Sequence, residues 1–74
     1  MNVTVRLFAT LREGRGKELS LDLPEGSTPA TAAGRLGIEL RDIAILLVNG
    51  RTGAADGALA EDDRVSFFPP VGGG

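Results

Sequence analysis

The chain has 74 residues and contains no cysteine or histidine, so it has no disulfide, no thiolate nucleophile and no imidazole base. Those residue types are also the usual ligands of transition metals, so we expect no metal site, and a chain this short buries one core, which predicts one domain. With 8 basic and 10 acidic residues, no dense basic face and no apolar run of about 18 residues, we expect a cytoplasmic protein without nucleic-acid or membrane partners.

The first two segments alternate between apolar and polar residues in the way that predicts a β-hairpin. Residues 2–9 place four apolar side chains on one face: Val3, Val5, Leu7 and Ala9. Phe8 is the exception, because it falls on the opposite face. Residues 17–23 alternate in the same way, and Gly14 and Gly16 between the two segments favour a turn that needs positive φ.

The middle of the chain predicts one short helix and then a strand. Thr28 and Pro29 are typical of a helix N-cap and first position, and Gly37 is typical of the position after a helix, so we expect a helix over residues 30–36. A helix this short is stable only when it packs on other elements. Residues 43–48 are continuously apolar, which predicts a strand covered on much of both faces.

The last third predicts two further strands. Asn49-Gly50 is a strong turn signal, and a short strand is expected near residues 51–53. Leu59 is the large apolar residue of the irregular segment that follows, and we expect it to fill the core. Residues 64–68 predict the last strand, which must end where two prolines follow it, because proline cannot donate to a sheet.

This order of elements predicts an α+β fold. The helix crosses over after the hairpin, so the first and last strands can lie side by side and parallel. That arrangement is a ubiquitin-like β-grasp, a mixed sheet of four to five strands with one short helix packed across it. A ferredoxin-like split fold is the alternative, but it needs a second helix. We expect residues 1–68 to form the domain and residues 69–74 to form an extended, flexible, glycine-rich tail.

The C-terminal segment is the strongest candidate for chemistry. It reads Phe67-Phe68-Pro69-Pro70-Val71-Gly72-Gly73-Gly74. The prolines hold the chain extended as it leaves the sheet, and the glycines carry no side chains. Such a tail, which reaches at most about 17 Å beyond the second proline, can enter a channel too narrow for a Cβ and deliver its terminal carboxylate to a reactive centre. The alternative is an ordinary frayed end.

This segment resembles the end of the ubiquitin-like sulfur carriers, the MoaD/ThiS family, which includes the small subunit of molybdopterin synthase and the thiamine-pathway carrier. The similarity covers most of the chain: residues 3–13 resemble the first strand and following turn of the molybdopterin branch, residues 48–50 resemble the turn after the third strand, and residues 59–65 resemble the segment that leads into the last strand. The short length and the helix region look more like the thiamine carrier. Gly72 stands at the family's variable position, and Gly73-Gly74 match its terminal pair.

The resemblance implies a carrier rather than an enzyme. An E1-like enzyme would use ATP and Mg²⁺ to adenylate the Gly74 carboxylate, and a sulfur donor would convert it to a thiocarboxylate. A large synthase subunit, or another sulfur-accepting enzyme, would then take the sulfur for molybdopterin, with the thiamine thiazole or another product as the alternative. The chain itself would bind no cofactor. The residues that would thread the tail into these partners are Pro69, Pro70, Val71, Gly72 and Gly73.

Phe8 and Phe68 form the candidate partner-binding pair. Each is out of phase with the core-facing residues of its strand, so adjacent parallel strands would bring both rings out on the outer face, beside the tail. An exposed aromatic pair suits docking, and family members use such a patch. The alternative is a second small core beneath a loop. The uniformly apolar third strand leaves open whether Leu46 or Leu47 joins the pair.

The remaining charged residues are assigned to solvated positions. Residues 61–63 are three consecutive acids, which are typical of a solvated turn rather than a cation site. Arg12, Arg15 and Lys17 are expected to form a solvated rim, with contact to an acidic partner as the alternative.

Two other functions remain open at this point. The domain could be an interaction module that docks through Phe8 and Phe68 without terminal chemistry. It could also be a modifier whose Gly74 is joined to a lysine, because the activated end would be the same.

Overall fold

A computed structural model describes residues 1–71 of the chain. These residues form β1 (Asn2–Leu7), the 3₁₀ helix η1 (Ala9–Arg12), β2 (Glu18–Asp22), α1 (Pro29–Arg35), the 3₁₀ helix η2 (Leu40–Asp42), β3 (Ile45–Val48), β4 (Arg51–Thr52) and β5 (Arg64–Phe68). The strands make one sheet in the order β2-β1-β5-β3-β4. Within these residues, no helix has the length and apolar character needed to cross a membrane.

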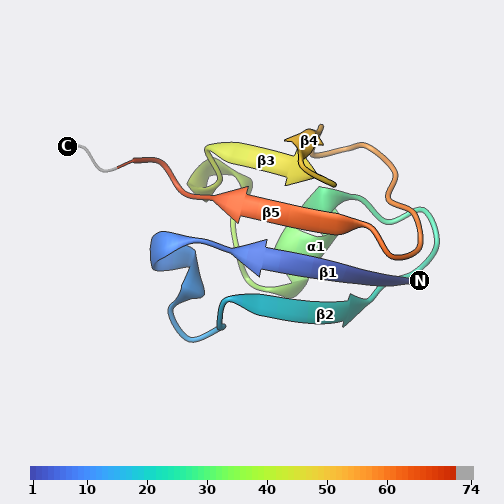
Figure 1. Ribbon diagram of the computed structural model, residues 1–74, viewed down its shortest axis with the longest axis horizontal. Coiled ribbons are helices and arrows are strands. Elements are labelled where there is room, and N and C mark those ends of the chain that lie inside the picture. The colour runs from blue at the N-terminus through green and yellow to red at the C-terminus, as the bar shows by residue number, and fades with distance from the viewer. Residues whose placement is uncertain (72–74) are drawn as a thin grey trace.

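The sheet has the mixed topology of the predicted β-grasp. β1 and β5 are parallel, whereas β2 pairs with β1, and β3 with both β5 and β4, in antiparallel fashion. The helix α1 lies across one face of this sheet, and no element of residues 1–71 covers the other face (Figure 1). The α+β class and the ubiquitin-like fold are therefore confirmed, and one face of the sheet is available for contacts.

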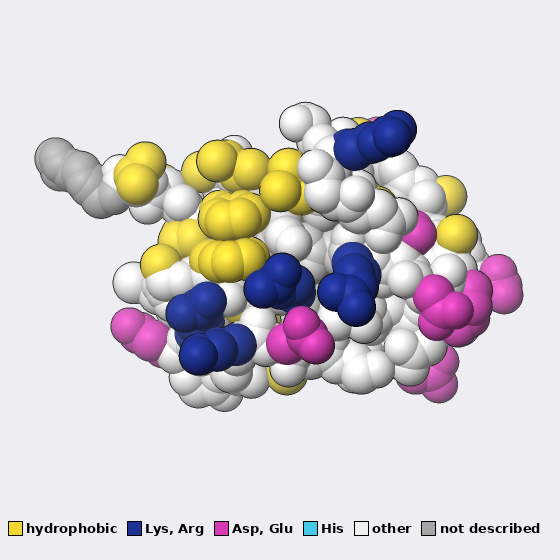
Figure 2. Space-filling model, viewed as in Figure 1, with side chains coloured by type: hydrophobic (Ala, Val, Ile, Leu, Met, Phe, Trp, Pro, Cys, Tyr) yellow, Lys and Arg dark blue, Asp and Glu magenta, His cyan; other side chains and the backbone are white. Residues whose placement is uncertain are grey.

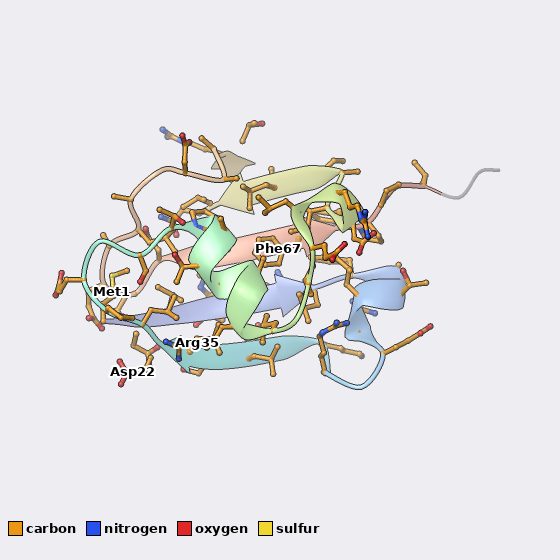
Figure 3. The ribbon with its side chains drawn as sticks, turned by 180° about the vertical axis from the view of Figure 1, so that it is seen from behind. Met1, Asp22, Arg35 and Phe67 are labelled. Atoms are coloured by element: carbon orange, nitrogen blue, oxygen red, sulfur yellow. The ribbon has the colours of Figure 1, made fainter. Side chains whose placement is uncertain are left out.

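The core lies between α1 and the covered face of the sheet, as the view from behind shows (Figure 3). Its central side chains come from the two parallel strands and are fully buried: Val3, Val5, Leu7, Val65 and Phe67. The helix adds Ala32 and Ala33. Leu59 fills the core as expected, with 6% of its surface exposed. Small alanine side chains let the short helix approach the sheet closely, so packing holds a helix that would not form alone.

The hairpin differs from its prediction at the end of β1. Ala9 was expected on the core face, but it is exposed, with φ of 53°, and it begins η1. A left-handed residue turns the chain out of the strand direction, and η1 then buries Leu11 in the core. Phe8 keeps extended geometry, with φ of −126° and ψ of 149°, so its side chain continues the alternation of β1 and lies on the face opposite Leu7. Gly14 and Gly16 have the expected positive φ.

The ends of α1 are satisfied by local and by distant groups. Thr28 caps the first turn, accepting from the Thr31 amide while its own amide donates to the Thr31 hydroxyl. Arg15, from the hairpin turn, donates to the carbonyls of Leu36 at 2.9 Å and Gly37 at 3.4 Å. The prediction of a solvated rim is wrong for Arg15, because its guanidinium satisfies carbonyls at the end of the helix.

β3 is covered on one face rather than on both. Leu46 pairs with the buried Phe67 and packs against the core, whereas Leu47 pairs with Ser66 on the outer face. Ile45 is 53% exposed. The expected double coverage is therefore wrong, because α1 covers only one side of the sheet.

Candidate functional site

Phe8 and Phe68 meet on the open face of the sheet. Leu7 lies opposite Phe67 in the parallel pairing of β1 and β5, so the next residue of each strand comes to the other face at the same level. The two rings are stacked, with centroids 4.0 Å apart and planes within 10°. The expected emergence of both rings together is confirmed as geometry, and the rings are half-buried rather than sunk into a second core.

β3 extends this apolar surface. Ile45 lies directly opposite Phe68 in the antiparallel pairing, and Leu47 follows two residues further on the same face. We call these four residues the aromatic platform: Phe8, Phe68, Ile45 and Leu47. Figure 2 shows apolar side chains gathered on the open face near the end of the sheet from which the C-terminal segment leaves. The open question between Leu46 and Leu47 is thus answered by register, in favour of Leu47.

Two arginines border the platform. The guanidinium carbons of Arg6 and Arg12 lie 5.5 Å and 5.4 Å from the centre of the Phe8 ring. Cations at this distance are attracted by the ring quadrupole. Arg12 is also anchored by its Nε, which donates to the Leu7 carbonyl at 2.8 Å. The apolar surface therefore carries positive charge on its rim.

The C-terminal segment leaves the sheet from a fixed point. The carbonyl of Phe68 accepts a hydrogen bond from the Ala44 amide at 2.7 Å, which ties the last residue of β5 to the segment before β3. Pro69 and Pro70 then restrict φ and offer no amide hydrogen. Val71 is 97% exposed, and these three residues extend beyond the sheet (Figure 1). Gly72, Gly73 and Gly74, the remaining candidate site residues, lie outside the described residues.

Two hollows flank the base of this segment. One, of about 340 Å³, is walled by both platform phenylalanines together with Ala9, Pro70 and Val71. The other, of about 400 Å³, is walled by Arg15, Asp42 and Ile38 among others. Pro69 and Pro70 line both, so the proline pair forms a ridge between an apolar hollow and a more polar one.

The acidic turn at residues 61–63 accepts hydrogen bonds from other parts of the chain. The Glu61 carboxylate accepts from the Asn2 amide, and the Asp63 carboxylate accepts from the Asn49 side chain at 2.9 Å and the Ala60 amide at 2.8 Å. Among residues 1–71, no group of three acidic side chains is arranged to hold a metal ion. The described part of the site offers an apolar surface with positive charge on its rim, beside the point where the chain leaves β5.

Comparison with known proteins places this chain in a family. The ThiS family model matches residues 5–74. The chain belongs to the ThiS family. It is thus one of the ubiquitin-fold sulfur carriers and modifiers of the MoaD/ThiS type, which are small carrier proteins rather than enzymes. No curated protein matches this chain.

Solved structures of the same kind are similar over nearly the whole chain. The small archaeal modifier protein 1 of Haloferax volcanii is 27% identical, with a TM-score of 0.81, and the match covers 95% of this chain and 98% of that one. A protein described as molybdopterin converting factor, subunit 1, from Pyrococcus furiosus is 28% identical, with a TM-score of 0.79 and coverage of 96% and 99%. A complex of subunits 1 and 2 of the Helicobacter pylori factor contains a chain that shares the fold at 19% identity, with a TM-score of 0.68 and full coverage of both chains.

Sequence reasoning missed two members of the site. Ile45 was expected to be covered, although its place in the platform follows once its pairing with Phe68 is known. Arg6 was not singled out, yet its position two residues before Phe8 puts both side chains on the same face of β1. The alternation of β1 was the signal that could have found Arg6.

Proposed function

We propose that this chain is a sulfur carrier activated at the carboxylate of Gly74. An E1-like enzyme joins that carboxylate to AMP from ATP and releases pyrophosphate. A hydrosulfide then attacks the acyl carbon and expels AMP, leaving a thiocarboxylate. A carboxylate is a poor electrophile and the mixed anhydride with AMP is a good one, which is why activation is needed. ATP and Mg²⁺ belong to the partner.

The observation that carries this proposal is the exit of the chain from β5. The Phe68 carbonyl is anchored, the two prolines stiffen the next residues, and Val71 projects almost fully exposed beside the aromatic platform. A docked platform would therefore hold the tail in a defined direction. The absence of cysteine and histidine suits a carrier, since the reacting group is the terminal carboxylate and the catalytic groups belong to its partners.

We propose that the sulfur goes to molybdopterin through a large synthase subunit that docks on Phe8 and Phe68. The similarity to the Pyrococcus subunit 1, and the existence of a two-subunit complex in Helicobacter, support this choice. The thiamine thiazole is the alternative acceptor, favoured by the match to the ThiS family.

The proposal is tested by labelling with a thiol-alkylating reagent. Because the chain has no cysteine, such a reagent finds an anionic sulfur nucleophile only if a thiocarboxylate has formed. After incubation with the cognate E1-like enzyme, ATP and a sulfide source, intact mass should show one alkyl group. The variant lacking Gly74 is the matched control and should stay unlabelled. A wild-type chain that remains unlabelled, with an enzyme active on another carrier, would defeat the proposal.

Protein conjugation is the second candidate, because the Haloferax relative is named as a modifier. The same adenylate would then be attacked by a lysine amine, forming an isopeptide bond and releasing AMP. A search of cell extracts for lysines joined to the terminal glycine separates the two outcomes.

A further inference from the structure

The two arginines beside Phe8 differ from the third arginine of the hairpin in what their side chains contact. Arg15 uses Nε and both terminal nitrogens on backbone carbonyls, including that of Leu11 at 3.2 Å. Within the described part of the chain, Arg12 donates only from its Nε, to the Leu7 carbonyl. Among residues 1–71, no carboxylate lies within 4.0 Å of Arg12. Its paired terminal nitrogens are therefore available while the side chain is held in place.

Arg6 is less available than Arg12. Its Nε lies 3.7 Å from the Glu18 carboxylate, and both side chains are at least half exposed, at 50% and 57%. An exposed pair of this kind is weak. Arg6 therefore adds positive charge at the platform, partly offset by Glu18, and Arg12 is the better hydrogen-bond donor.

The open face carries most of its acidic charge at one end of the sheet. In Figure 2 basic side chains border the apolar patch, with single acidic side chains beside them, while a larger group of acidic side chains lies at the opposite end of the face. Glu61 and Asp22 both lie at that far end, next to Asn2 at the start of β1. A partner that approaches the platform with negative charge meets attraction at one end and is repelled at the other, which sets its orientation.

We infer that Arg12, assisted by Arg6, is a binding site for a carboxylate side chain of the partner enzyme. The inference rests on the proposed function, because the partner considered is the E1-like enzyme. A guanidinium with a fixed Nε and two free terminal nitrogens matches a carboxylate in bidentate geometry. An aspartate or glutamate of the partner bonds Arg12. An apolar side chain beside it covers the platform and excludes water from this ion pair.

The test measures affinity for the E1-like enzyme by calorimetry without ATP, so that binding is separated from chemistry. Arg12→Gln should weaken binding by about tenfold to a hundredfold, as expected for a charge-assisted hydrogen-bonded pair. Arg6→Gln should weaken it less, because Glu18 already offsets that charge. Arg35→Gln is the matched control, since it removes the same charge from exposed helix surface on the covered side of the sheet (Figure 3), and it should stay within about twofold.

Arg12→Lys tests the geometry, because lysine keeps the charge but cannot form the fork. It should recover only part of the lost affinity. Equal affinities for Arg12→Gln and Arg35→Gln would overturn the inference, as would an unchanged salt dependence in Arg12→Gln. If Arg12→Gln lowers the melting temperature enough to unfold the chain, Arg6→Gln decides, because its only polar side-chain contact among the described residues is the weak Glu18 pair.

Two readouts separate this inference from the proposed function. Affinities measured without ATP report on the inference, whereas labelling of the wild-type chain and of Arg35→Gln, both with an intact terminal carboxylate, reports on the proposed function. Failure of the wild-type chain to be labelled would reject the proposed function, whatever the affinities show.

Discussion

Phe67 and Phe68 are neighbours in the chain but lie on opposite faces of β5. Phe67 is fully buried beneath α1, whereas Phe68 stacks on Phe8 on the open face. Phe67→Ala should therefore destabilise the fold by about 3–5 kcal/mol, the usual cost of deleting a buried phenyl ring. Phe68→Ala should cost about 1–2 kcal/mol, since stacking and partial burial are all it loses. Denaturant unfolding of the two variants measures the difference.

Binding to the adenylating enzyme should depend more on Phe68 than on Phe67, which is the reverse of their order in stability. Phe68→Ala should weaken binding to the adenylating enzyme at a temperature where it is fully folded. Equal stability losses for the two variants would contradict the assignment of the two faces.

Pro69 and Pro70 should act on binding rather than on folding. Replacing Pro70 by alanine lets the segment sample more conformations, at a cost of about 0.4–1 kcal/mol when it is ordered in the partner. We expect KM for the adenylating enzyme to rise by about two- to fivefold, with kcat unchanged. Pro24→Ala, an exposed position before α1, is the control and should leave KM unchanged. A fall in kcat alone would argue against stiffening as the role of these prolines.

Asn49 holds the turn between β3 and β4 onto β5. It has φ of 53°, its side-chain oxygen accepts from the Arg64 amide at 2.9 Å, and its side-chain nitrogen donates to Asp63. Asn49→Ala loses these bonds and keeps a strained φ, so it should cost about 2–3 kcal/mol. Asn49→Gly loses the bonds but relieves the strain and should cost about 1 kcal/mol less. Thermal unfolding compares them, and an equal loss would mean that φ contributes nothing.

Arg15 should be a structural residue. Arg15→Gln leaves carbonyls at the end of α1 without their donor and should destabilise the chain by about 1–3 kcal/mol. Lys17→Gln removes the same charge from an exposed neighbouring position and should change stability by less than about 0.5 kcal/mol. If the two variants unfold together, the bonds to the helix end do not contribute to stability.

Gly53 is required by a close approach to β3. A Cβ at this position would lie 2.7 Å from Cγ2 of Val48, a stiff β-branched side chain that packs against the core. Gly53→Ala should therefore cost about 1–3 kcal/mol. Gly57→Ala, where the Cβ would lie an ordinary 3.5 Å from the Ala54 carbonyl oxygen, should be neutral or stabilising by about 0.4–1 kcal/mol. Melting temperatures of the two variants make the comparison.

Much of the fold could be predicted because its signals are local. Thr28 and Pro29 mark the start of α1, Asn49-Gly50 marks a turn, and alternation in β1 and β5 separates core from surface. Each of these signals depends on residues that are only a few positions apart in the sequence. The phase of Phe8 and Phe68 followed from the same alternation, given the topology of the fold.

What the sequence alone determined is the element order, the proline-stiffened end and the positions of the two aromatic residues, because alternation, capping and proline geometry act over a few residues. The tertiary structure decided which face of a uniformly apolar strand is buried, since Leu46 and Leu47 differ only in their partners on β5. It also decided that Arg15 bonds the helix end, 21 residues away at Leu36, and that within residues 1–71 the terminal nitrogens of Arg12 have no hydrogen-bond partner beside Phe8. The physical reason is that hydrogen-bond partners distant in sequence become neighbours only when the sheet and helix pack.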